Sequence, residues 1–171
     1  TNKWSNDSQG VTRKPTDSGL GCYQMYVMDL GSDTVRLVST GKGATTCGYF
    51  FSSDQRVLYS STHAAGSECP PKPKRDGAYR WALDDYDIYS VTLDGKQLQR
   101  LTASEGYDAE ATISPDGKSI VWTSVKDGDL DLYIMNVDGT NVRRLTDDVG
   151  YDGGAFFSPD STRIVYRAAH P

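Results

Sequence analysis

Apolar residues along this chain fall in short runs that are rich in β-branched and aromatic side chains, and no run keeps a helical period. Turn-forming residues separate the runs, as in Ser114–Gly117 and Asp138-Gly139. In such turns Pro presets φ, Asp accepts hydrogen bonds from nearby amides and Gly takes positive φ. The pattern predicts four short antiparallel strands in succession: one that ends at 113, then 119–123, 131–137 and about 141–145.

The four-strand unit repeats along the chain. Five separate matches share one offset of 44 positions: Tyr89 with Tyr133, Arg100 with Arg144, Tyr107 with Tyr151, Pro115 with Pro159, and Ile120 with Ile164. A weaker earlier copy aligns Tyr26 with Tyr89 at an offset of 63, so about 19 extra residues lie between Tyr59 and Asp87. Four short strands at a period of about 40–45 residues are typical of one β-propeller blade. Because a blade cannot bury both faces alone, the repeated apolar positions are expected to pack between blades.

The predicted fold class is therefore all-β, a β-propeller of four-stranded antiparallel blades. About three blades' worth of strands is present, half of a six-bladed propeller. We divide the chain into the end of one blade (1–44), a blade with a long insertion at 60–86 (45–104), a second blade (105–148) and the first half of the next (149–171). Closed propellers have about four to eight blades. Either the remaining blades belong to the same longer chain, or a second copy completes the ring.

The composition of the chain argues against two classes of protein, nucleic-acid-binding proteins and membrane-spanning proteins. The net charge of −5 argues against nucleic-acid binding, which needs a surplus of Lys and Arg. With 24% charged and 37% hydrophobic residues the chain is expected to fold, and no apolar stretch approaches the length of a transmembrane segment. The chain opens without Met or a signal peptide, as expected of a mature or truncated product.

The segment Leu132–Thr140, followed by Arg143–Thr146 and Ser158–Asp160, resembles the WD-like repeat of TolB-type β-propellers. It is also similar to the repeats in the propellers of prolyl-oligopeptidase-type and tricorn-type peptidases. The resemblance covers roughly 22–167 and implies the propeller fold. TolB carries a separate α/β domain before its propeller, and the peptidases carry a hydrolase domain with a Gly-x-Ser-x-Gly motif. Neither is visible in this sequence.

Three cysteines, Cys22, Cys47 and Cys69, are expected on one face of the propeller. In a propeller, the connections from the second to the third strand and from one blade to the next emerge on that face. Cys47 begins a first strand, Cys22 precedes a third strand, and Cys69 lies in the insertion. We predict a disulfide between Cys47 and either Cys22 or Cys69, with one thiol left over; the alternative is three free buried thiols, since the spacings do not suit zinc. A disulfide fits an oxidising compartment, and the resemblance to TolB implies the periplasm or the cell exterior.

Carboxylates mark a candidate site at the central channel. Asp108 and Asp152 occupy equivalent positions just before first strands, which line the channel, and Glu110 lies two residues on, on the same side as Asp108. These carboxylates are predicted to face the channel mouth, where they would suit Ca²⁺ or a basic partner surface. Alternatively, each Asp caps its own turn. In the first copy Thr46 stands at the equivalent position.

A second acidic segment contains Asp127, Asp129 and Asp131 in alternation. It lacks the Glu at the twelfth position of a Ca²⁺-binding loop, so we interpret it as a solvated loop. We expect no resident metal or other cofactor, with Ca²⁺ as the one candidate.

The insertion at 60–86 is the most individual feature of the sequence. Pro70–Pro73 predicts an extended segment. It is followed by the aromatic and basic residues Tyr79, Arg80, Trp81 and Tyr86. Long ordered loops often carry function, and Tyr, Trp and Arg dominate interface energetics. We predict that these four residues contact a protein or glycan partner; alternatively, the aromatic rings fasten the loop to its blade.

No nucleophile, general base and orienting group cluster recognisably in the sequence, and His63 and His170 lack a motif. We therefore expect a non-catalytic binding or assembly scaffold of an exported protein rather than an enzyme. One alternative is the gating propeller of an exported hydrolase or peptidase whose catalytic domain lies outside this chain. Another is a structural subunit of a polymeric extracellular assembly.

Overall fold

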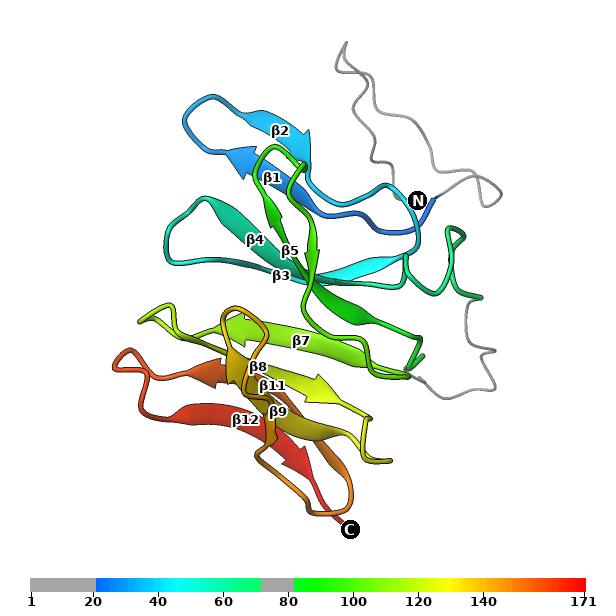
Figure 1. Ribbon diagram of the computed structural model, residues 1–171, viewed down its shortest axis with the longest axis vertical. Coiled ribbons are helices and arrows are strands. Elements are labelled where there is room, and N and C mark those ends of the chain that lie inside the picture. Colours follow the sequence, from blue (N-terminus) through cyan, green and yellow to red (C-terminus); the bar gives the residue numbers. More distant parts are fainter. Residues whose placement is uncertain (1–20, 72–81) are drawn as a thin grey trace, which may run out of the picture.

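The computed structural model describes residues 21–71 and 82–171, and these form a stack of antiparallel sheets (Figure 1). One complete sheet contains β3 (Thr45–Phe50), β4 (Arg56–Ser61), β5 (Asp87–Thr92) and β6 (Gln99–Arg100). The next contains β7 (Asp108–Ile113), β8 (Ser119–Ser124), β9 (Asp131–Asn136) and β10 (Arg143–Arg144). Two-stranded sheets flank them, β1 (Tyr26–Asp29) with β2 (Thr34–Leu37) and β11 (Tyr151–Phe157) with β12 (Ile164–Ala169). This arrangement confirms the predicted fold class.

The strand predicted at about 141–145 is shorter in the structure, Arg143–Arg144, although the Leu145 amide still donates to the Leu132 carbonyl at 2.7 Å. In both complete blades side chains also join the third and fourth strands. Arg100 lies 2.7 Å from Asp87 in one blade, and Arg144 pairs with Asp131 in the next. Behind each pair a threonine hydroxyl accepts a third-strand amide at 2.9 Å, Thr102 from Ile88 and Thr146 from Leu132. The repeated Asp and Arg positions are therefore structural.

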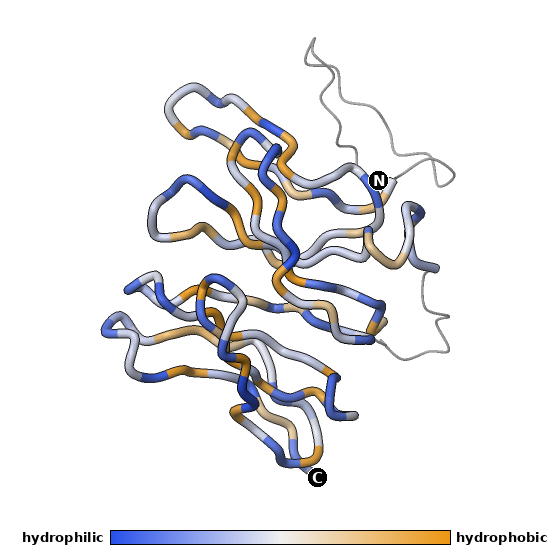
Figure 2. The backbone as a smooth tube through the Cα atoms, viewed as in Figure 1, coloured by the Kyte–Doolittle hydropathy of each residue, from blue (hydrophilic) through white to orange (hydrophobic). Residues whose placement is uncertain are grey.

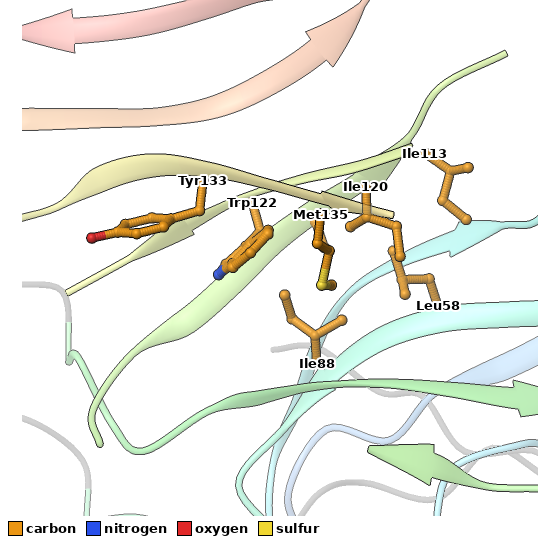
Figure 3. Close-up of a cluster of buried hydrophobic side chains, with 8 residues drawn as sticks. Leu58, Ile88, Ile113, Ile120, Trp122, Tyr133 and Met135 are labelled. Atoms are coloured by element: carbon orange, nitrogen blue, oxygen red, sulfur yellow. The ribbon is translucent and has the colours of Figure 1, made fainter. Parts of the chain in front are cut away.

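The main core lies between blades. Leu58 and Ile88 of one blade face Ile120, Trp122 and Met135 of the next, and Tyr133 lies beside Trp122 (Figure 3). Two further buried clusters fill the interfaces with the flanking half-blades. Figure 2 shows the apolar segments along the strands and the hydrophilic segments at the hairpin tips.

The Ser-Pro-Asp turns join the hairpins of successive blades. Within its turn, the Ser114 hydroxyl donates to Asp116 at 2.6 Å and accepts the amide of Ser119 at 2.9 Å. The Asp116 amide donates to the Ser161 hydroxyl of the next blade at 3.1 Å. The turn therefore both closes its own hairpin and helps to set the spacing between blades.

The half-blades at the two ends leave apolar positions uncovered. Val121 in the complete blade is 0% exposed, whereas Val165 at the equivalent position of β12 is 68% exposed. Tyr26 in β1 is likewise exposed, although its equivalents Tyr89 and Tyr133 are buried. Burial of the same repeat position thus depends on a neighbouring blade.

This dependence gives a matched test. We expect Val121→Ala to lower the free energy of unfolding by about 2 kcal/mol, because it removes two buried methyl groups and leaves a cavity. Val165→Ala makes the same chemical change at an exposed site and should change stability by less than about 0.5 kcal/mol. Urea denaturation of both variants of this chain measures the difference. Equal losses would show that the neighbouring blade does not determine the effect.

Candidate functional site

The first strands of three successive blades, β3, β7 and β11, carry the same irregularity. Each strand has a β-bulge, and at the bulge Cys47, Glu110 and Gly154 have φ of 53°, 59° and 61°. These three residues are related by the repeat offsets of 63 and 44. Positive φ is costly for Cys and Glu, and such strained residues cluster at functional sites.

The three bulges border one hollow of about 250 Å³. Its lining comes from β3, β7 and β11, with Ala111 and Ala155 on its apolar side and Tyr49 and Phe156 also contributing. The central bulge supplies a carboxylate, whereas the two flanking bulges supply only the short side chain of Cys47 and the bare backbone of Gly154. We call this space the channel hollow, since first strands line a propeller's central channel.

Glu110 is held in place by donors from two blades. Its Oε2 accepts hydrogen bonds from the Thr123 hydroxyl at 3.0 Å, the Tyr151 hydroxyl at 3.0 Å and the Gly154 amide at 2.9 Å. A Cβ at Gly153 would overlap the Tyr151 hydroxyl and would lie 2.6 Å from Glu110 Oε2. A glycine at position 153 is therefore needed for this arrangement.

The phenols of Tyr107 and Tyr151 remain protonated. Burial raises the pKa of Tyr151 and the neighbouring Glu110 carboxylate raises it further, while Arg167 acts in the opposite direction. Burial also raises the pKa of Tyr107 strongly, with Glu110 and Cys47 contributing. Arg167 donates to the Tyr151 hydroxyl at 3.1 Å and lies 5.5 Å from the centre of its ring.

The three predicted channel carboxylates separate in the structure. Glu110 lines the channel hollow, whereas Asp108 and Asp152 are buried. Asp108 accepts hydrogen bonds from the Ser104 hydroxyl and from Trp122 Nε1, and Asp152 pairs with His170 at 2.9 Å. The expectation that both aspartates face the channel mouth is wrong, because each turns inward to a polar partner instead.

The alignment of the first copy also needs correction. Thr45, and not Thr46, is equivalent to Asp108, since Thr45 pairs with Ser61 as Asp108 pairs with Ser124.

The acidic loop of Asp127, Asp129 and Asp131 does not converge on a common point. Asp127 accepts from the Tyr133 hydroxyl, Asp129 accepts the Gly150 amide at 2.7 Å, and Asp131 pairs with Arg144. Across residues 21–71 and 82–171, no three or more His, Cys, Asp or Glu side chains are grouped as metal ligands would be.

Sequence reasoning missed the repeated Asp87–Arg100 and Asp131–Arg144 pairs. Their signal was available as a constant separation of 13 residues within each repeat.

One disulfide joins Cys22 and Cys69, with their Cα atoms 5.3 Å apart, and Cys47 is a free, exposed thiol. A disulfide was correctly expected, but the predicted participation of Cys47 is wrong. Cys47 lies at a bulge inside β3 and lines the channel hollow, instead of lying at the start of the strand. The insertion folds back on the preceding blade, where the Gly43 amide donates to the Ser67 carbonyl at 2.9 Å, and this brings Cys69 to Cys22.

Of the predicted partner-binding residues, Tyr79, Arg80 and Trp81 lie outside the described part of the chain. Tyr86 lies at the end of the insertion, with its ring edge-on to Tyr107 at 5.9 Å, and burial raises its pKa. Its ring therefore packs beside the first strand of the next blade.

Comparisons with known proteins agree with this architecture. The repeated blades define a β-propeller, and the family model described as TolB beta propeller domain matches residues 82–170, more than half of the chain. The chain belongs to this family.

Solved structures show the same fold. TolB from Acinetobacter baumannii matches with a TM-score of 0.61 and 23% identity over 84% of this chain and 31% of its own. A structure assigned to TolB from Agrobacterium tumefaciens matches with a TM-score of 0.65 and 23% identity over 93% of this chain and 50% of its own. The tricorn protease matches with a TM-score of 0.55 and 14% identity over 82% of this chain and 12% of its own. The chain thus spans half or less of the length of these proteins.

In the described ranges, no helix has the length and apolar character needed to cross a membrane.

The disulfide gives a direct stability test. Replacing both Cys22 and Cys69 by Ala should lower the free energy of unfolding by about 2–4 kcal/mol, because the crosslink restricts the unfolded chain. Cys47→Ala is the matched control and should change it by less than about 0.5 kcal/mol. Guanidinium denaturation of the non-reduced proteins measures both. A larger loss from the Cys47 variant would contradict the pairing.

The Glu110 hydrogen bonds make a prediction about titration. In Glu110→Gln the pKa of Tyr151 should fall toward its usual value of 10.0, because the negative neighbour is gone, but stay above it because burial remains. Carbon-13 NMR of labelled tyrosine follows the titration. Asp127→Asn is the control, since it should lower the pKa of Tyr133 and leave that of Tyr151 unchanged. An unchanged pKa of Tyr151 in Glu110→Gln would refute the assigned contact.

Proposed function

We propose that this protein is a non-catalytic binding scaffold of an exported TolB-like propeller protein. It contacts a protein partner through the face where the 62–86 connection emerges, here called the connection face. One observation carries the proposal: the Cys22–Cys69 disulfide fastens this long connection to the preceding blade. The described residues 62–71 are thereby anchored, and a surface that is held in advance lowers the entropic cost of binding.

The disulfide also supports export. Structural disulfides persist in oxidising compartments such as the periplasm and the cell exterior. Membership of the TolB beta propeller domain family agrees with that setting.

The polar groups of the described chain support a role without catalysis. Ser61 lies 2.9 Å from His63 Nδ1, but Ser61 is buried, and the His63 ring packs 4.2 Å from that of Tyr89. Burial lowers the pKa of His63. His170 pairs with the buried Asp152 through its Nε2, the nitrogen that takes the proton of the nucleophile in a serine-type triad. Neither histidine combines an accessible nucleophile with an orienting carboxylate, as hydrolytic triads require.

The residue types in the insertion support a protein partner. Tyr79, Arg80 and Trp81 belong to the residue types that contribute most at protein interfaces.

Photo-crosslinking tests the proposal. A benzophenone amino acid at Ala64, exposed in the anchored connection, should form one major protein adduct in extracts of the source cells. The same label at Lys96, exposed on the hairpin after the third strand, is the matched control and should give none. Replacing Arg80 and Trp81 by Ala should weaken the Ala64 adduct. Equal labelling from both positions would contradict a dedicated connection face, and an adduct removed by glycosidases would favour a glycan.

A further inference from the structure

We propose that the channel hollow binds a basic side chain, a lysine or arginine of the protein partner, with Glu110 as its counter-charge. This inference rests on the proposed function in taking the partner to be a protein. It names the chemistry that the partner must bring to the channel.

The carboxylate of Glu110 has one committed oxygen and one free oxygen. All three of its hydrogen bonds go to Oε2, from Thr123, Tyr151 and Gly154. None of the described residues donates to Oε1, and no described cation lies within ion-pair distance of the carboxylate. Glu110 therefore presents to the hollow that it lines a carboxylate without a direct ion pair from residues 21–71 and 82–171.

The carboxylate is also preorganised. Its donors come from its own blade and from the next, so its position is fixed by the packing of two blades. Groups held in advance of binding avoid the entropic cost of ordering a flexible side chain.

The rest of the hollow suits an alkyl stem. Ala111 and Ala155 contribute apolar surface, while Tyr49 and Phe156 lie at its border and are 37% and 52% exposed. Long basic side chains lay their methylene groups on such surfaces, and aromatic faces attract the cationic head. The net charge of −5 adds a favourable long-range field for a cation.

Two competing occupants fit less well. A bound Ca²⁺ needs six to eight oxygen ligands, whereas Glu110 is the one carboxylate among the described residues that line this hollow. Arg167 of the protein itself is the nearby cation, but its guanidinium is committed to the hydroxyl and ring of Tyr151.

Cys47 provides a probe inside the hollow, since its thiol lines the same space and is exposed. Its thiolate attacks a methanethiosulfonate reagent at the sulfenyl sulfur, forms a mixed disulfide and releases methanesulfinate. The measured quantity is the ratio of two rates, that of the cationic 2-aminoethyl reagent over that of the neutral 2-hydroxyethyl reagent. Because a carboxylate lies nearby, we expect this ratio to be about tenfold higher for Cys47 than for a free thiol in solution. Glu110→Gln should abolish most of this preference.

Asp160→Asn is the matched control. It removes the same charge from an exposed turn outside the hollow and should leave the preference intact. Comparing reagents on one protein cancels any effect of Glu110 on the reactivity of the thiol itself. A ratio equal in the unmodified protein and in Glu110→Gln would overturn the proposal.

A second measurement needs no variant and mimics the lysine side chain directly. Butylammonium chloride should slow modification of Cys47 by the neutral reagent, and sodium chloride at equal ionic strength should not. When butylammonium occupies half of the hollows, the rate should fall by about twofold. No slowing at any accessible concentration would overturn the proposal. Because neither measurement uses the natural partner, this site can fail while crosslinking from Ala64 still supports the scaffold.

Discussion

Packing of one blade against the next is the constraint on which the rest of this structure depends. A four-stranded sheet buries its strands only if side chains from a neighbour cover its face. Val121 and Val165 make the point, since the same residue at the same repeat position is buried in a complete blade and exposed at the open end. The interface that buries Leu58 and Ile88 against Trp122 also aligns β3 with β7, and thereby creates the channel hollow.

Much of the fold could be predicted from the sequence. The 44-residue spacing between Tyr89 and Tyr133, and between the Ser-Pro-Asp turns, was sufficient to predict four-stranded blades, because the turns and the short β-branched and aromatic runs are local signals. The short fourth strands were less predictable. The Arg144–Asp131 contact adds a side-chain link between β10 and the neighbouring β9, which the pattern of apolar residues does not indicate.

The candidate site was harder to predict, for physical reasons. Glu110 was identified as a channel residue, but the repeat gave no sign that Asp108 would turn inward to Trp122 Nε1. The β-bulge that exposes Glu110 is a local departure from strand geometry, and its residues do not share a side-chain type. The Cys22–Cys69 pair depends on how the insertion folds back, which residue spacing does not determine.

The bulge position has a further consequence for how such proteins diversify. Cys47, Glu110 and Gly154 line one shared space, yet the interblade core is built from other residues. Side chains at this position can therefore vary during evolution without repacking the interior. Each blade contributes one such variable site at a fixed angle around the axis. In these three blades the position carries a thiol, a carboxylate and a bare backbone, so the chemistry of the shared space can change while the packing between blades stays the same.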